Sequence, residues 1–472
     1  MYTKTLVLLL CCLFAACEQQ STSAPKSAQE EPTAANENGA SNEKQPNILL
    51  IVADDLGYTD LGSFGGEIST PNLDRLAMSG TRLLNFHTSA SCSPTRAMLM
   101  TGTDNHLAGM GSQGKSLITP LQKGHPAYQN KLSPKLKTIA KRLQEVGYRT
   151  YASTKWHLGD EVPQLPGRRG FDRSLALMEG GGGHFDDMPL AEAYGKAHWL
   201  LDDEPLELPE DFYSTVYMTD RLIEFIKTDE RQTAPFFAYL GYTAPHWPLQ
   251  APREYLEKYQ GYYEAGYEAL LQARMTGAKK MKVVPETAQG VTKNAEVIPW
   301  DELSEEQKQG FVARMVAYAA MVHILDEQVG RLLEFLEQHG TLDNTIIIFM
   351  SDNGAEGHVM EERPTWKDWI QANFDNSLEN IGNQTSYVTL GQGWARATAA
   401  PFRASKSKVS EGGIRVPAFV HFPESTEANG IVDNAFMTVM DLAPTFLELA
   451  GAESDEPDSG KSMARPVQSI CG

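Results

Sequence analysis

Cysteine and positive charge are both scarce in this chain. The 472 residues contain 5 cysteines, and 41 Lys and Arg stand against 61 Asp and Glu, for a formal net charge of −20. Nucleic acids and anionic membrane surfaces are bound by clustered Lys and Arg, so this balance argues against both as partners. A hydrophobic content of 41% excludes disorder of the whole chain and predicts one large domain or two smaller ones. We therefore expect a globular protein with a small ligand.

An apolar run at the start of the chain is too short to span a bilayer comfortably. It reads MYTKTLVLLLCCLFAAC, with a Lys before the run and small residues before a cysteine, as in export signals. Its end resembles a bacterial lipobox, so we predict that residues 1–17 are a lipoprotein-type signal peptide ending at a lipidated Cys17. The protein would then be exported to the bacterial periplasm and anchored to a membrane through this lipid only. Phe14 stands where the lipobox prefers an aliphatic residue, and soluble release is the alternative.

Residues 18–45 lack aromatic and long aliphatic side chains altogether. Such a segment buries too little apolar surface to offset its chain entropy, so we predict a disordered tether. The folded part is expected to begin at residue 46 and to reach residue 452.

Two short apolar runs end in acidic residues. Residues 47–52 are rich in branched aliphatics and are followed by Asp54 and Asp55, and residues 345–350 are followed by Asp352 and Asn353. Continuous apolar runs of this length are typical of strands buried on both faces. Taken alone, each of these acidic groups is explained equally well as part of a turn or as part of a functional site.

Two further strand candidates end in basic or imidazole side chains. GYRTYASTKWHLG delivers Lys155 and His157, and APFFAYLGYTAPHWP delivers His246. Between these strands lie residues 133–147 and 311–340, whose apolar positions recur at helical spacing and which end in Gly. Alternating strands and helices predict an α/β fold with a large mixed, mostly parallel sheet sandwiched by helices. Because ligands bind at the carboxyl ends of such strands, we expect the four groups to converge.

The chemistry of these groups predicts a metal-assisted site for an anion. Three carboxylates and an amide offer oxygen ligands, which suit Ca²⁺, with Mg²⁺ as the alternative, better than Zn²⁺. The predicted metal ligands are Asp54, Asp55, Asp352 and Asn353. Lys155 and the two histidines beside such an ion would bind an anion and move protons, so the substrate should carry sulfate or phosphate.

Cys92 lies at the predicted start of a helix, in the run ASCSPTRAMLMTG. It is open to four interpretations: a nucleophile, a metal ligand, half of a disulfide with Cys471, or a residue chemically altered before use. Free backbone N–H groups at a helix start favour negative charge there. Arg96, one turn later, adds a permanent cation with two-pronged donor geometry.

The pentapeptide CSPTR, continued by Thr101-Gly102, resembles the signature of the type I, formylglycine-dependent sulfatases. Other segments resemble that family in the same order along the chain: VADDLG, KWHLG, APHWP, SDNGAEG and EGGIRVP. TGTDNHLAGMG and DNSLENIGNQTSYV resemble its bacterial arylsulfatase branch. The resemblance runs from Pro46 to about Gly451, and it implies an alkaline-phosphatase-like fold. Thr95 and Thr154 depart from the family pattern, which more often has Ser and Gly there.

The resemblance implies a role for each candidate residue. A formylglycine-generating enzyme would oxidise Cys92, and the hydrate of the aldehyde would attack sulfur beside the divalent ion. His157 would assist deprotonation of the hydrate or the elimination of sulfate. His246 and Lys406 would protonate or stabilise the leaving oxygen. Lys155 and Arg96 would bind sulfate oxygens.

The resemblance leaves three functions to separate. Hydrolysis of aryl or alkyl sulfate monoesters is the first, phosphonate or phosphate monoester hydrolysis in the same fold is the second, and a lipid-anchored anion-binding protein without turnover is the third. The family usually continues into a small C-terminal subdomain, so residues 453–472 are expected to be the truncated start of that region.

Three further segments are assigned from their composition. EGGGGHFDD lacks the spaced glycines and Lys of a phosphate loop. We predict a flexible active-site loop there, with His184 near the substrate. Residues 261–305 have mixed charge and no clean period, and we predict an insertion over the sheet edge. Trp366, Trp369 and Trp394 either line the substrate pocket or pack in the core.

Overall fold

The structure is a computed structural model that describes residues 45–114, 118–290, 297–422 and 430–452. The predicted signal peptide, almost all of the predicted tether, Cys471 and residues 453–472 lie outside the described residues, so those predictions stay predictions. Within the described ranges, no helix is long and apolar enough to cross a membrane.

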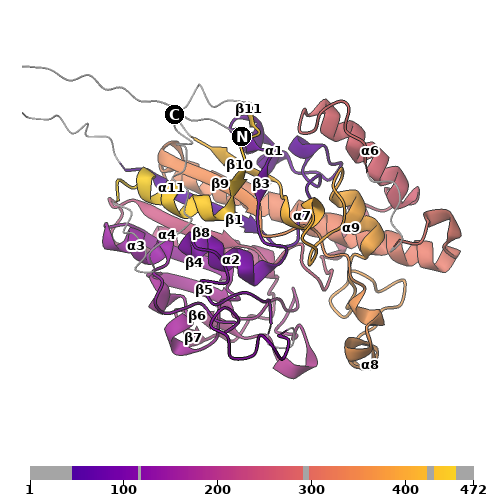
Figure 1. The fold of residues 1–472 in the computed structure, drawn as a ribbon, viewed down its shortest axis with the longest axis horizontal. Coiled ribbons are helices and arrows are strands. Elements are labelled where there is room, and N and C mark those ends of the chain that lie inside the picture. Colours follow the sequence, from indigo (N-terminus) through magenta and orange to yellow (C-terminus); the bar gives the residue numbers. More distant parts are fainter. Residues whose placement is uncertain (1–44, 115–117, 291–296, 423–429, 453–472) are drawn as a thin grey trace, which may run out of the picture. The chain divides into compact units, whose positions relative to one another are not determined.

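The described residues form twelve strands and eleven α-helices (Figure 1). The strands are β1 (Asn47–Ala53), β2 (Thr81–Leu83), β3 (Phe86–His87), β4 (Arg149–Lys155), β5 (Arg173–Leu177), β6 (Trp199–Leu201), β7 (Glu204–Pro205), β8 (Phe236–Gly241), β9 (Thr345–Ser351), β10 (Ala418–His421), β11 (Ile431–Asp433) and β12 (Met437–Thr438). The helices are α1 (Pro71–Met78), α2 (Cys92–Thr101), α3 (Ile139–Glu145), α4 (Ser214–Thr228), α5 (Arg253–Lys258), α6 (Gly266–Lys280), α7 (Glu305–Gln338), α8 (Pro364–Asn373), α9 (Gln392–Thr398), α10 (Glu411–Ile414) and α11 (Leu442–Leu449).

Ten of the described strands form one mixed sheet, in the order β11-β2-β10-β9-β1-β8-β4-β5-β6-β7. The five central strands, β9, β1, β8, β4 and β5, run parallel, whereas β10, β6 and β7 pair antiparallel at the flanks. The predicted α/β class with a mostly parallel sheet is therefore confirmed. The four strands that carry the candidate residues, β9, β1, β8 and β4, are direct neighbours, so their carboxyl ends share one edge.

Successive residues of β1 bury their side chains on opposite faces of the sheet. Leu49 and Ile51 pack in the core that includes α4 and α7, whereas Leu50 and Val52 pack in the core that includes α2, α3 and α11. A strand covered on both faces has no solvent-facing side, which explains why its sequence is continuously apolar rather than alternating.

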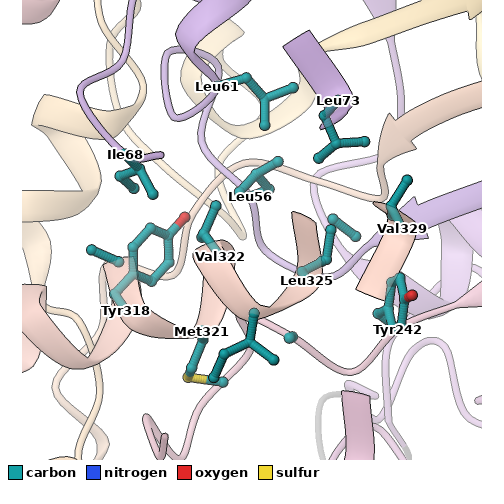
Figure 2. Close-up of a cluster of buried hydrophobic side chains, with 14 of the residues drawn as sticks. Leu56, Leu61, Ile68, Leu73, Tyr242, Tyr318, Met321, Val322, Leu325 and Val329 are labelled. Carbon is teal, nitrogen blue, oxygen red and sulfur yellow. The ribbon is translucent and has the colours of Figure 1, made fainter. Parts of the chain in front are cut away.

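The long helix α7 supports the segment that follows β1. Its N-cap is Ser304, whose side chain accepts a hydrogen bond from the Gln307 backbone N–H while the Gln307 side chain accepts one from the Ser304 backbone N–H, a capping box. Figure 2 shows the contact: apolar side chains of α7 pack beneath those of the segment after β1. The labelled members are Leu56, Leu61, Ile68, Leu73, Tyr242, Tyr318, Met321, Val322, Leu325 and Val329.

Residues 261–305, predicted as an insertion over the sheet edge, contain the helix α6 over residues 266–280, although their sequence shows no clean period. The buried Arg274 of this helix pairs with Asp60, which is also buried, and its Nε donates to Glu67 Oε2 at 2.8 Å. Tyr318 Oη donates to Asp60 Oδ2 at 2.6 Å and contacts the Asp55 carbonyl oxygen at 3.1 Å. This ion-pair network, which sequence periodicity does not report, ties the turn after β1 to α6 and α7.

Replacing Arg274 by Met is expected to lower the free energy of unfolding by about 3–5 kcal/mol, because Asp60 would remain buried without its cation. Urea denaturation followed by circular dichroism measures the loss. Arg253→Met is the control: Arg253 is 81% exposed in an ion pair with Glu257 and should change stability by no more than about 0.5 kcal/mol. Equal stability of the Arg274→Met variant and the parent would contradict the role of the network.

Candidate active site

The two acidic turns lie side by side at the carboxyl edge of the sheet. Because β1 and β9 pair in register, with Ala53 opposite Ser351, the residues that follow them meet. Asn353 Nδ2 donates to Asp55 Oδ1 at 2.6 Å, and the Asp55 backbone N–H donates to Asp352 Oδ1 at 3.3 Å. Asp55 adopts φ 69°, which turns its side chain back toward the edge. The predicted metal ligands thus come together.

The donor atoms of this cluster fit a hard divalent cation. Asp54 and Asn353 are fully buried, and among the described residues Asp54 Oδ1 and Asn353 Oδ1 have no hydrogen-bond partner. Burial, followed by the neighbouring Asp352 carboxylate, raises the pKa of Asp54 to about 7, and burial also raises the pKa of Asp55. Buried oxygens without donors are costly unless a cation satisfies them, and oxygen-only ligation suits Ca²⁺ or Mg²⁺.

Cys92 is the first residue of α2 and is fully buried beside the acidic turns. Single ligand atoms of Asp54, Asp55, Cys92 and His246 all lie within 4.8 Å of one another, a second possible ligand combination at the same place. Burial raises the pKa of the Cys92 thiol to about 11, although Lys155 and Lys406 oppose this shift. Gln113 Nε2 lies 3.6 Å from Cys92 Sγ.

Arg96 and Lys155 supply the positive charge on one side of the cluster. Arg96 Nη2 lies 2.8 Å from Asp352 Oδ2, and Lys155 Nζ lies 2.5 Å from Asp54 Oδ2. Arg96 Nη1 also donates to the Lys155 carbonyl oxygen at 2.6 Å and to Tyr239 Oη at 3.1 Å. Both cations are therefore buried and held by the acidic turns.

Lys406 supplies the positive charge on the opposite side. Its Nζ lies 2.7 Å from Asp55 Oδ1 and 3.9 Å from Glu356 Oε2. Burial by itself lowers the pKa of Lys406, but the combined charges of Asp55, Cys92, Glu356 and Asp54 outweigh burial and raise the pKa well above its ordinary value. Lys406 is therefore a buried, permanently charged ammonium group.

His157 and His246 face the cluster from the ends of β4 and β8. His246 Nε2 lies 3.7 Å from Asp55 Oδ2, and its Nδ1 lies 2.5 Å from the Trp247 carbonyl oxygen, so the proton is assigned to Nδ1. His157 adopts φ 54°, and its buried Nδ1 has no hydrogen-bond partner among the described residues. Burial, with nearby lysines, lowers the pKa of both imidazoles well below 6.5. Both rings are held neutral at pH 7.

His184 lies behind His246 rather than at an opening. It is 1% exposed, its Nδ1 lies 2.7 Å from Ser214 Oγ, and its Nε2 lies 3.1 Å from the His246 carbonyl oxygen. Both ring nitrogens are thus engaged by the protein. Proximity to the site agrees with the sequence prediction, but these hydrogen bonds favour positioning of His246 over direct contact with a substrate.

His184 is expected to make stability depend on pH. Burial lowers its pKa to about 4, below the unfolded value of 6.5, so its share of stability is full above pH 6.5 and is lost as pH falls toward 4. This loss amounts to about 3 kcal/mol. Urea denaturation at pH 7 and pH 4.5 should show a smaller difference for His184→Gln than for the parent. The exposed His106→Gln should leave the difference unchanged, and an unchanged difference in His184→Gln would refute the prediction.

Three residues of the cluster were missed by the sequence analysis. Tyr239 lies in the middle of β8, where a strand residue carries no sign that it meets Arg96. Gln113 lies in a loop with no recognisable pattern. Glu356 follows Asn353 by three residues in the SDNGAEG segment, and that spacing within a metal turn was a signal that pointed to it.

The fold and the site together define a class of protein. One cysteine at a helix start is surrounded by buried oxygen ligands, three cations and two neutral imidazoles. This arrangement is typical of a metal-assisted hydrolase of anionic esters. The family model described as Sulfatase matches residues 46–452, so the chain belongs to the sulfatase family. It is an enzyme that hydrolyses sulfate esters, and its family typically uses a metal ion and formylglycine.

Individual relatives agree with this assignment. The chain is 44% identical over 436 residues to an uncharacterized sulfatase of Schizosaccharomyces pombe, covering 88% of this chain and 76% of the relative. It is 37% identical to an arylsulfatase of Klebsiella aerogenes, covering 92% of each chain. Among solved structures, Ps i-CgsB in complex with k-i-k-neocarrahexaose superposes with a TM-score of 0.61 at 29% identity, covering 87% of this chain and 73% of that chain.

Proposed function

We propose that this enzyme hydrolyses aryl or alkyl sulfate monoesters and that a formylglycine made from Cys92 is the nucleophile. One observation carries the proposal: Cys92 Sγ is buried within 4.8 Å of ligand atoms of Asp54, Asp55 and His246. The residue therefore sits where a nucleophile, an oxygen-ligand metal site and a proton-transfer group meet. The CSPTR pentapeptide supports oxidation of this particular cysteine.

The reaction needs both hydroxyl groups of the aldehyde hydrate. One hydroxyl gives up its proton as its oxygen bonds to sulfur, the bond from sulfur to the ester oxygen breaks, and the leaving oxygen takes up a proton to give the alcohol or phenol. The second hydroxyl then loses its proton, its oxygen forms the C=O bond, and the bond from carbon to the sulfate oxygen breaks. Sulfate leaves, the aldehyde is regenerated, and water restores the hydrate. A serine or unaltered cysteine has no second hydroxyl for this elimination.

The surrounding residues divide the remaining work. Asp54, Asp55, Asp352 and Asn353 would hold Ca²⁺ or Mg²⁺, which when bound neutralises sulfate charge and lowers the pKa of a nearby hydroxyl. His157, with an unengaged Nδ1, is placed to accept the proton of the second hydroxyl. His246, whose Nε2 carries no proton in the assigned tautomer, and the charged Lys406 would stabilise the leaving oxygen, and Lys406 is the group that can protonate it. Lys155 and Arg96 stabilise the sulfate oxygens.

The surroundings of His246 favour an aromatic leaving group. Trp247 stacks beside the His246 ring with a centroid distance of 4.9 Å, and Trp366 of α8 meets Trp247 edge to face at 5.6 Å. Trp366 and Trp369 keep part of their surface exposed, whereas Trp394 is fully buried against Tyr267 and carries no such role. The relative from Klebsiella aerogenes is named an arylsulfatase, which agrees with this preference.

Maturation and location complete the proposal. A formylglycine-generating enzyme would oxidise Cys92 before the chain closes over it, because the thiol is fully buried in the folded protein. Export to the periplasm and lipid attachment at Cys17 rest on the sequence of residues 1–17. Radiolabelled palmitate incorporated by the parent but not by a Cys17→Ala variant would support the anchor.

Sulfate release from aryl, alkyl and carbohydrate sulfates, with Ca²⁺ supplied, tests the proposed activity. We expect aryl sulfates to be turned over fastest. Matched aryl phosphate and phosphonate esters are the controls, and faster cleavage of either would replace the sulfate assignment with the phosphoryl one. Peptide mass spectrometry across residue 92 separates an enzyme from an anion-binding protein, since an intact thiol in protein from its native host would favour binding alone.

A further inference from the structure

We propose that the glycine-rich loop, residues 180–184, fixes the positions of both imidazole rings of the active site. The loop follows β5, next to β4 in the sheet, and its backbone packs directly on His157 and His246. Gly180 and Gly181 are thus positioning residues for the two proton-transfer groups. This inference rests on the proposed function, which gives those two histidines their roles.

Gly180 touches the ring of His157. A Cβ atom at Gly180 would lie 2.6 Å from His157 Cε1 and 3.1 Å from its Nε2, closer than carbon atoms approach in folded proteins. The ring cannot simply turn away at no cost, because His157 is partly buried, its Nδ1 is buried, and its backbone already adopts φ 54°. Only glycine leaves the ring where it stands.

Gly181 touches the ring of His246. A Cβ atom there would lie 3.1 Å from both Cε1 and Nδ1 of His246 and 3.0 Å from Leu190 Cδ1. Gly181 also has φ +156°, a conformation that side-chain-bearing residues rarely adopt. Nδ1 is the atom that contacts the Trp247 carbonyl oxygen, so displacement of this ring would disturb the hydrogen bond that sets its tautomer.

The end of the loop holds His246 from its backbone. His184 Nε2 contacts the His246 carbonyl oxygen at 3.1 Å, and the His184 N–H donates to Gln250 Oε1 at 3.0 Å. The Gly183 N–H donates to the Met188 carbonyl oxygen at 2.9 Å, which closes the loop on itself. These hydrogen bonds therefore anchor the loop. Its glycines allow the loop backbone to lie close to the imidazole rings.

The other two glycines of the run provide an internal control. A Cβ at Gly182 would meet Ala197 Cβ at 2.8 Å and the Met188 carbonyl oxygen at 3.2 Å, and one at Gly183 would meet Asp186 Oδ1 at 2.6 Å. Neither position touches a histidine. Gly180→Ala and Gly182→Ala therefore crowd the same loop to a similar degree, and only the first displaces an active-site ring.

The experiment compares the full-length, matured Gly180→Ala, Gly181→Ala and Gly182→Ala variants, with Gly310→Ala in open space on α7 as a second control. We expect kcat for aryl sulfates to fall about 10- to 100-fold in the first two variants, because small misplacements of a reacting group have such effects. KM should change by less than about threefold. Gly182→Ala and Gly310→Ala should keep kcat within about twofold of the parent, whatever their melting temperatures.

Two further readouts identify which ring has moved. In Gly181→Ala the loss should grow as the leaving phenol becomes less acidic, because stabilisation of the leaving oxygen by His246 matters most for a poor leaving group. Crystal structures of Gly180→Ala and Gly182→Ala should show the His157 ring shifted in the first alone. Should Gly180→Ala fail to fold, Gly181→Ala carries the same comparison.

The inference is overturned if Gly180→Ala and Gly182→Ala lose kcat equally and in step with their melting temperatures, or if neither ring moves. Its failure is distinguishable from failure of the proposed function. Wild-type rates in His157→Ala and His246→Ala would refute the proton-transfer roles, whereas the crystal structures would still decide whether the loop fixes the rings.

Discussion

Replacing Cys92 by Ala is expected to reduce sulfate release by at least about 10⁴-fold, because no nucleophile would remain to form the covalent intermediate. The residue is buried at the start of α2, between the acidic turns and His246, and no other described cysteine is available. The loss should appear almost wholly in kcat, since the charged groups that bind sulfate stay in place. Initial rates with an aryl sulfate measure it.

Ser93→Ala is the matched control for this variant. Ser93 occupies a variable position of the pentapeptide and is as buried as Cys92, so its replacement tests the local packing of α2 without removing the nucleophile. We expect Ser93→Ala to keep most of the activity and to show the aldehyde at residue 92 by mass spectrometry. An active Cys92→Ala protein, or active wild-type protein that carries only the thiol, would refute the formylglycine assignment.

Replacing Asp54 by Ala is expected to remove the divalent ion and to lower kcat/KM by about 10³-fold or more, since a bound metal contributes several kcal/mol of transition-state stabilisation. Asp54 Oδ1 is a buried oxygen without a hydrogen-bond partner in the part of the chain that the structure describes, and Asp54 Oδ2 lies 2.5 Å from Lys155 Nζ. Isothermal titration with Ca²⁺ and with Mg²⁺ reports the loss independently of activity. Treatment of the wild-type enzyme with a chelator, followed by Ca²⁺, should abolish and restore turnover.

Asp326→Asn is the control for removing a buried carboxylate. Asp326 is fully buried in α7 and accepts hydrogen bonds from the backbone N–H groups of Asn72 and Leu73, away from the acidic turns. We expect this variant to lose stability while it still binds one divalent ion. Unchanged Ca²⁺ binding by Asp54→Ala would show that the ion binds at another place in the protein.

The strands that carry the site were predictable because their signal is local. A strand buried on both faces must be apolar throughout, so the runs before Asp54 and Asp352 stand out in the sequence, and the structure places β1 at Asn47–Ala53 and β9 at Thr345–Ser351. The predicted helix start at Cys92 is likewise confirmed. The convergence of these residues followed from a general rule for parallel sheets.

The supporting residues were not predictable from local patterns. The run over residues 133–147 indicated a full helix, but α3 spans only Ile139–Glu145 because Thr138 caps it. Helix α6 was missed because its inward face carries the charged Arg274 rather than an unbroken apolar stripe. The glycine run suggested a flexible loop. In the structure, Gly180 and Gly181 instead leave room for the imidazole rings of His157 and His246.

The sequence by itself determined which side chains end the buried strands, which cysteine begins the CSPTR pentapeptide and which family the chain belongs to. These features lie in short segments of the sequence. Their apolar runs and the spacing of their polar residues can be recognised without knowledge of the fold. Only the tertiary structure decided that His184 supports His246, that Arg274 steadies the acidic turn and that two glycines touch the imidazoles. Those relations join residues tens to hundreds of positions apart, and their distances arise only when strand order and helix packing bring the segments together.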